Sequence, residues 1–104
     1  MPLIAVFTTL PSRQQARDLA ASLVESGLVA CAQISEIESL YTWQGKIQQD
    51  SEYRLMLKAP EHRYSAIEAA ILAAHSYDLP AIHALRIEHV HGPYGAWIES
   101  SCPG

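Results

Sequence analysis

Histidine and cysteine are the residues of this chain best suited to binding a metal ion. The chain contains five histidines and two cysteines, and Cys31 and Cys102 lie too far apart to form a CxxC motif. Thiolate and imidazole groups are ligands that suit copper and zinc. His89 and His91 would share one face of a strand, an arrangement that can chelate an ion. We take Cys31 and His75 as the candidate metal ligands; the alternative is that each is an ordinary structural side chain.

A second group combines aromatic and charged side chains in a candidate ligand-binding cleft. Aromatic walls with a few polar groups are typical of small-molecule pockets. Two alternatives stay open, because Glu52 can form an ion pair with a lysine across a hairpin, and aromatic residues often form the core of a subunit interface. The candidate cleft residues are Trp43, Lys46, Glu52, Lys58, Tyr77 and Trp97.

No pattern in the sequence indicates catalysis. No serine or cysteine nucleophile has a base at motif spacing, and no glycine-rich phosphate loop occurs. Glu52, His75 and Lys58 are capable of acid–base chemistry, but the sequence offers no reaction for them. We therefore expect a binding protein that is not an enzyme.

Composition argues against several other classes of protein. Seven basic against eleven acidic residues give a net charge of −4, whereas a nucleic-acid-binding protein normally carries a basic excess. No apolar run approaches the roughly 18–20 residues that cross a bilayer. The sequence has no basic stretch typical of a signal peptide and no disulfide framework. We expect a cytoplasmic protein with reduced thiols and no nucleic-acid or membrane partner.

The elements that position these residues are predicted in the order β-α-β-β-α-β. Strands are expected at residues 3–9, 28–41, 47–59 and 82–90, helices at 12–26 and 61–74, and a final helix or strand at 94–100. Ser12 and Gln15 form a capping box at the start of the first helix, and Gly27 suits its C-terminal end. An irregular pattern over residues 34–38 suggests a β-bulge or a bend. This order is typical of an α+β, ferredoxin-like sandwich, here as one domain over residues 1–104.

One face of such a sheet is covered by two helices, and no segment of the sequence is left to cover the other. Hydrophobic residues make up 49% of the chain and charged residues 17%, against about 25% charged in typical soluble domains. We therefore expect the bare face to contact another copy of the chain. The long central hairpin also favours pairing between the edges of subunits.

Four segments, in the same order and at similar spacing, resemble the CutA divalent-cation-tolerance family. They are residues 41–47 (YTWQGKI) followed by Glu52 and Lys58, residues 28–32 (LVACA), residues 75–80 (HSYDLP) and residues 94–97 (YGAW). The chain departs from the family at Ser76, where relatives usually carry proline, and at Ala81, where they usually carry glutamate. Thr8 and Ala74 stand where some relatives carry cysteine and histidine.

The resemblance implies a homotrimer of ferredoxin-like subunits, similar in architecture to the PII signalling proteins. It also implies a cytosolic or organellar location and a role in tolerance of divalent metal ions such as Cu²⁺. Two hypotheses follow for the mechanism. In the first, the protein binds a divalent ion such as Cu²⁺ directly, without turnover. In the second, it is a regulatory module that binds a small ligand or a partner protein in the clefts between subunits.

Overall fold

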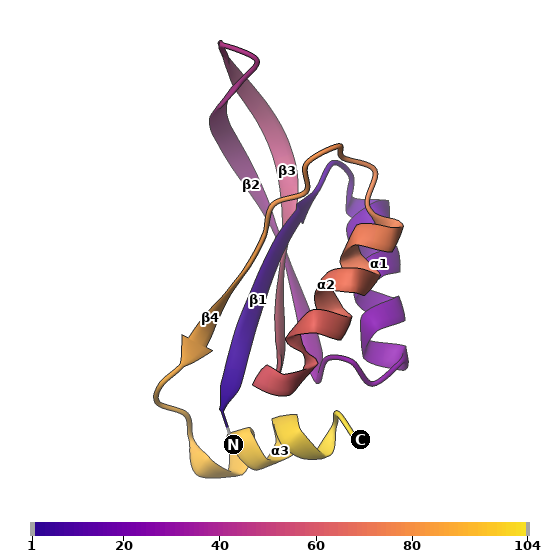
Figure 1. Ribbon diagram of the computed structural model, residues 1–104, viewed down its shortest axis with the longest axis vertical. Coiled ribbons are helices and arrows are strands. Elements are labelled where there is room, and N and C mark those ends of the chain that lie inside the picture. The colour runs from indigo at the N-terminus through magenta and orange to yellow at the C-terminus, as the bar shows by residue number, and fades with distance from the viewer. Residues whose placement is uncertain (1, 104) are drawn as a thin grey trace.

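The chain folds into a four-stranded antiparallel sheet with two helices on one face and a third helix across one end (Figure 1). The computed structural model describes residues 2–103, so residues 1 and 104 of the predicted domain lie outside it. The elements are β1 (Leu3–Leu10), α1 (Arg13–Glu25), β2 (Cys31–Trp43), β3 (Lys46–Pro60), the 3₁₀ turn η1 (Glu61–Arg63), α2 (Tyr64–Ala74), β4 (Ile82–Ile87) and α3 (Gly92–Ser100). The strand order β2-β3-β1-β4 is that of a ferredoxin-like sandwich, which confirms the predicted fold class.

The N-terminus of α1 contains half of the predicted capping box. The Gln15 backbone N–H donates to Ser12 Oγ at 3.1 Å, as predicted. The Gln15 side chain does not return a bond to Ser12; instead its Oε1 accepts from the Ser76 hydroxyl at 3.3 Å. This second bond ties the segment that precedes β4 to the start of α1. At the other end of the helix, Gly27 adopts a φ of +75°, as its predicted role requires.

Strands β2 and β3 pair without interruption, from Cys31 opposite Lys58 to Trp43 opposite Lys46. Of the two alternatives predicted for residues 34–38, a bulge or a bend, the bulge is therefore wrong. The irregular pattern has another cause: Ile34 and Ile37 point to opposite faces of a regular strand, because both faces carry apolar side chains.

A two-residue turn joins these strands at the tip of the hairpin. Gln44 and Gly45 have φ angles of 52° and 78°, as a type I′ turn requires. The hairpin projects beyond the helices along the longest dimension of the molecule, which measures 44 Å (Figure 1). The outer half of the hairpin therefore lies beyond α1 and α2, and a site can form beside it.

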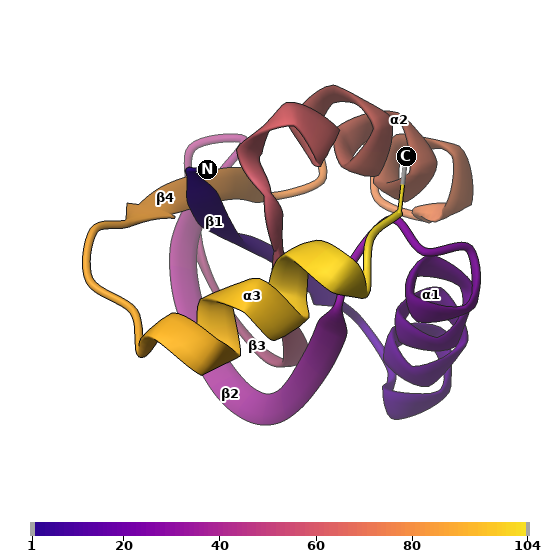
Figure 2. The same ribbon diagram turned by 90° about the horizontal axis from the view of Figure 1, so that it is seen from below.

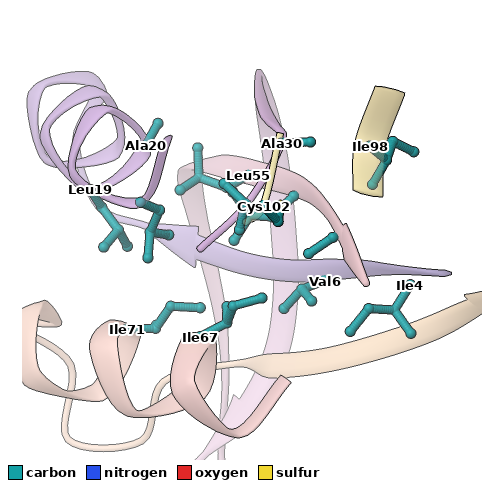
Figure 3. Packing of buried hydrophobic residues seen from close by; sticks show 14 of the residues in the cluster. Ile4, Val6, Leu19, Ala20, Ala30, Leu55, Ile67, Ile71, Ile98 and Cys102 are labelled. Carbon is teal, nitrogen blue, oxygen red and sulfur yellow. The ribbon is translucent and has the colours of Figure 1, made fainter. Parts of the chain in front are cut away.

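The core lies between the sheet and the helices α1 and α2. Val6 of β1 is paired with Leu57 of β3, and both side chains are fully buried. Figure 3 shows Ile67 of α2 pointing toward Val6, with Ile71 one turn further along the helix in the same core. Burying each such side chain contributes about 1.5–3 kcal/mol. This packing joins the strands that carry the hairpin to the helices.

Helix α3 is the final segment that the sequence left open between helix and strand. It crosses the end of the sheet at which β1 begins (Figure 2), and its Ile98 is fully buried. Strand β4 ends at Ile87, three residues earlier than predicted, and His91 is the N-cap of α3. His89 and His91 therefore lie outside the strand, and the expectation that they share a strand face is wrong. Within residues 2–103, no helix is long and apolar enough to cross a membrane.

The sheet face opposite α1 and α2 is only partly covered. Phe7 stacks on His83 of the neighbouring strand, with ring centroids 5.1 Å apart. Leu85 lies two residues further along β4 on the same face, and 58% of it is exposed. We call the surface formed by Phe7, Met56, His83 and Leu85 the open face.

Candidate functional site

A groove of about 840 Å³ separates the outer half of the hairpin from the segment that precedes β4. The hairpin forms one wall and residues 76–81 form the other, with β1 ending between them. It is lined by Thr9, Glu38, Ser39, Leu40, Tyr41, Thr42, Trp43, Glu52, Ser76, Tyr77, Asp78, Leu79 and Ala81. Three of the six predicted cleft residues, Trp43, Glu52 and Tyr77, are brought together here.

Glu52 is the most buried of the ionisable groups in this groove. Only 7% of the residue is exposed, and the Tyr77 hydroxyl donates a hydrogen bond of 2.8 Å to its Oε2. A charged group is seldom buried to this extent without a partner. The structure therefore places a buried carboxylate and a neutral donor side by side at the centre of the groove.

Two tyrosines in the groove are held in the protonated state. Burial, followed by the hydrogen bond to Glu52, raises the pKa of Tyr77 well above its ordinary value of 10.0. The pKa of Tyr41 is also raised, mainly because its hydroxyl donates to Asp50. At neutral pH both rings present neutral hydroxyl groups, and the carboxylates carry the negative charge of the groove.

His75 holds the wall formed by residues 76–81 in place. Its Nδ1 accepts from the Tyr77 backbone N–H at 3.1 Å, so Nε2 must carry the proton and donate to the Thr9 carbonyl oxygen, 2.7 Å away. The imidazole ring also contacts the Tyr77 ring, with centroids 4.8 Å apart. Both ring nitrogens are thus occupied by the backbone, and His75 positions Tyr77 instead of presenting a free ligand atom.

Lys58 and Trp97 lie in a different cluster at the opposite end of β3. Lys58 Nζ donates to Gln33 Oε1 at 3.2 Å and to the Tyr94 hydroxyl at 3.1 Å. Trp97 stacks on Tyr94 with centroids 5.7 Å apart, and Cys31 Sγ lies 3.8 Å from the Tyr94 hydroxyl oxygen. Since Lys58 is six positions from Glu52, about 20 Å of strand separates the two groups.

The register of the hairpin also tests whether Glu52 can form an ion pair with a lysine on the opposite strand. Glu52 lies opposite Ile37, whereas Lys46 lies opposite Trp43 and Lys58 lies opposite Cys31. Neither lysine is across the hairpin from Glu52, so the proposed cross-strand ion pair is wrong. Lys46 stands at the turn of the hairpin and does not line the groove.

The two candidate metal ligands do not meet within one chain. Cys31 lies in the row of Ala5 and Lys58, whereas His75 contacts Thr9, four positions further along β1. That spacing corresponds to about 13 Å, compared with metal–ligand bonds of about 2.0–2.3 Å. Among residues 2–103, no three His, Cys, Asp or Glu side chains form a group that could hold a metal ion. The pair Cys31 and His75 therefore does not fit a single metal site in one subunit.

Several groove residues were not predicted from the sequence, although a signal existed for two of them. Counting back from the turn places Ser39 and Tyr41 on the same face of the hairpin as Glu52. Asp78 has no such signal, because only the fold of residues 76–81 brings it to the hairpin. Tyr94 was likewise missed as the partner of Lys58, because α3 carries it there from the far end of the chain.

Comparisons with known proteins place the whole chain in one family. Residues 4–101 match the family model described as "CutA1 divalent ion tolerance protein". The divalent-cation tolerance protein CutA of Thermotoga maritima is 33% identical over 99 residues, which cover 95% of this chain and 98% of that protein. The chloroplastic protein CutA 1 of rice is 36% identical over 97% of this chain, but the chain spans only 58% of the rice protein's length.

The fold is also that of solved structures with related sequences. A structure described as the periplasmic divalent cation tolerance protein CutA from Archaeoglobus fulgidus superimposes with a TM-score of 0.95 at 30% identity. The match covers 97% of this chain and 99% of that one. The similarity therefore extends over the hairpin, the groove wall and α3 together.

Proposed function

The chain belongs to the CutA1 divalent ion tolerance family, and from this premise we propose that it supports tolerance of Cu²⁺ by binding without turnover. The proposal includes a homotrimer as the assembly and the cytoplasm as the location. In this mechanism a ligand occupies the groove beside the hairpin, and the protein acts as a regulatory module.

The groove is the observation that carries this proposal. It combines the aromatic side chains Trp43, Tyr41 and Tyr77 with the buried carboxylate of Glu52, as small-molecule sites commonly do. The hydroxyl of Tyr77 and the backbone contacts of His75 hold Glu52 and Tyr77 in place before any ligand arrives. A site prepared in this way favours binding, because little ordering remains to be done.

A growth experiment tests the role of the groove. Cells that lack this protein and are sensitive to Cu²⁺ receive the original chain, a Trp43→Ala variant or a Leu72→Ala variant. Leu72 is the control, because it is 52% exposed on α2 and lies outside the groove. We expect Trp43→Ala to fail to restore growth, while Leu72→Ala restores it fully. Full restoration by Trp43→Ala contradicts the proposed role of the groove.

Direct binding of Cu²⁺ is the second candidate, and one observation favours it. Cys31 is a free, partly exposed thiol, and a threefold axis would bring its three copies into equivalent positions. Calorimetric titration of metal-free protein with Cu²⁺ tests this mechanism. Cys31→Ala should abolish binding, whereas His75→Ala should retain it, because both nitrogens of His75 are occupied. Binding no tighter than the millimolar range excludes this candidate.

The assembly and the location rest on separate observations. The exposed Leu85 and the Phe7–His83 stack supply an apolar surface for contact between subunits. Cys31 and Cys102 are both free thiols, which agrees with a reducing compartment such as the cytoplasm. Fractionation of cells tests the location, and recovery of the protein outside the cytoplasmic fraction contradicts it.

A further inference from the structure

We infer that the groove binds an organic cation: an amine, guanidinium or quaternary ammonium compound with a small apolar body. This inference rests on the proposed function, because it specifies the ligand class of the same groove. It is carried by three observations, which concern the charge of the lining, the burial of Glu52 and the exposed aromatic rings.

The lining of the groove carries negative charge and no positive charge. Three of its residues are acidic, namely Glu38, Glu52 and Asp78, and none is lysine or arginine. The lining therefore repels an anionic ligand such as a phosphate or a carboxylate, which would also find no cationic donor. A positively charged ligand is attracted by all three carboxylates at once.

The burial of Glu52 indicates where the cationic group of a ligand would bind. Among the described residues its only hydrogen-bond partner is the neutral Tyr77 hydroxyl, although just 7% of Glu52 is exposed. A buried carboxylate loses most of its hydration, and an adjacent opposite charge compensates for that loss. The Tyr77 hydroxyl satisfies Oε2 but does not neutralise the charge. A ligand ammonium or guanidinium group at Oε1 would do so through a charge-assisted hydrogen bond.

The exposed rings of the hairpin favour an organic cation over a metal ion. Trp43 is 39% exposed and Tyr41 is 41% exposed, and both line the groove. Faces of tryptophan and tyrosine attract amine and quaternary ammonium groups, and the same rings can cover an apolar body. A metal ion would need convergent ligands, and within residues 2–103 no group of three His, Cys, Asp or Glu side chains provides them.

Titration of the assembled chain of residues 1–104 with three matched probes tests the inference. Phenethylamine is the cation, phenethyl alcohol is its neutral analogue and 3-phenylpropanoate is the anion. Binding at pH 7 is followed by nuclear magnetic resonance through the indole N–H signals of the two tryptophans. Trp43 lines the groove, whereas Trp97 stacks on Tyr94 outside it and serves as the internal control.

We expect phenethylamine to shift the Trp43 signal and to bind at least about tenfold more tightly than the alcohol, as one charge-assisted hydrogen bond provides. The anion should not bind. Glu52→Gln should weaken amine binding about tenfold. Glu25→Gln, which removes the same charge from the exposed end of α1, should leave amine binding unchanged. Asp78→Asn, at an exposed position in the groove wall, should weaken it about threefold even if Glu52→Gln fails to fold.

Three results would overturn the inference: equal binding of the amine and the alcohol, a shift of Trp97 without Trp43, or no shift of Trp43 at millimolar amine. None of these decides the proposed function, which the growth of Trp43→Ala cells tests independently. If Trp43→Ala fully restores growth and the groove still binds the amine selectively, the groove is a cation site without a role in Cu²⁺ tolerance.

Discussion

The carboxylate of Glu52 and the hydroxyl of Tyr77 are the two groups whose burial matters most at the scale of single residues. The hydroxyl lies 2.8 Å from Oε2, and this bond helps to hold a charge away from water. Burial of the ring and then this same contact raise the pKa of Tyr77, because ionisation would place a second negative charge beside Glu52 and away from water.

Tyr77 should make the protein less stable at alkaline pH. In the unfolded chain Tyr77 releases its proton near its ordinary pKa of 10.0, whereas in the folded chain burial and Glu52 raise that pKa. Above pH 10 the unfolded state therefore binds fewer protons, and the free energy of unfolding falls as pH rises. Tyr77→Phe should make the slope of the free energy of unfolding against pH shallower, by at most the amount that corresponds to about one bound proton. Chemical denaturation across pH 8–12 measures it, and an unchanged slope contradicts the assignment.

Thr8 offers a second test at the scale of one residue. Its side chain is 1% exposed, and its Oγ1 has no hydrogen-bond partner among the described residues. Thr8→Val replaces the hydroxyl with a methyl group of similar size, so we expect the free energy of unfolding to rise by about 1 kcal/mol. Thr42→Val, at an exposed hairpin position, should change it by less than about 0.5 kcal/mol. Destabilisation by Thr8→Val would mean that the hydroxyl has a partner.

The hairpin and the segment of residues 76–81 form the groove at the scale of elements, and each is held differently. The hairpin depends on continuous pairing up to its turn. The facing segment has no such ladder and depends on the contacts of His75 and on the bond between Ser76 and Gln15. The pairing of β2 with β3 therefore positions one wall of the groove, and hydrogen bonds of side chains position the other.

Substitutions in the turn should change the stability of the hairpin in opposite directions. Gln44 adopts a φ of 52°, which asparagine tolerates better, so Gln44→Asn should stabilise the protein by a few tenths of a kcal/mol. Gly45→Ala should destabilise it by about 1 kcal/mol through backbone strain, because nothing lies within 4 Å of the added Cβ. Thermal unfolding measures both, with Gln49→Asn on β3 as the control. A neutral Gly45→Ala would contradict the type I′ turn.

The open face and the projecting hairpin dominate the molecule as a whole. A single subunit leaves Leu85 58% exposed and Ile47, near the tip of the hairpin, 79% exposed. The edge strands β2 and β4 each have one unpaired side, which can pair with another chain. These features support the proposed homotrimer and suggest where its subunits meet.

Leu85→Glu should therefore break the assembly. A charge on the open face would be buried in the contact between subunits at a cost of several kcal/mol. Leu72→Glu is the matched control, because Leu72 is similarly exposed, at 52%, but lies on α2. Light scattering should give three 11.5-kDa chains for the original protein and for Leu72→Glu, and a smaller species for Leu85→Glu. A well-folded single subunit of the original chain in dilute solution would contradict the trimer.

Much of the fold could be predicted from local patterns in the sequence. The apolar stripe of α1 (Arg13–Glu25), Ser12 at its start and Gly27 after its end are local signals, and the structure confirms them. The end of β4 (Ile82–Ile87) was predicted too late, because no glycine or proline before Gly92 marks the point at which the chain leaves the sheet. Boundaries of this kind depend on where pairing partners run out, and a single strand does not contain that information.

The candidate site divides in the same way. The sequence by itself determined the family, the order of the elements and the residue types of the groove, because these depend on composition and on spacing along the chain. Only the tertiary structure decided that Glu52 meets Tyr77, that Lys58 meets Tyr94, and that His75 bonds to the backbone. Those contacts join residues 25 to 66 positions apart, and only the packing of the helices and α3 against one sheet brings such distant residues together.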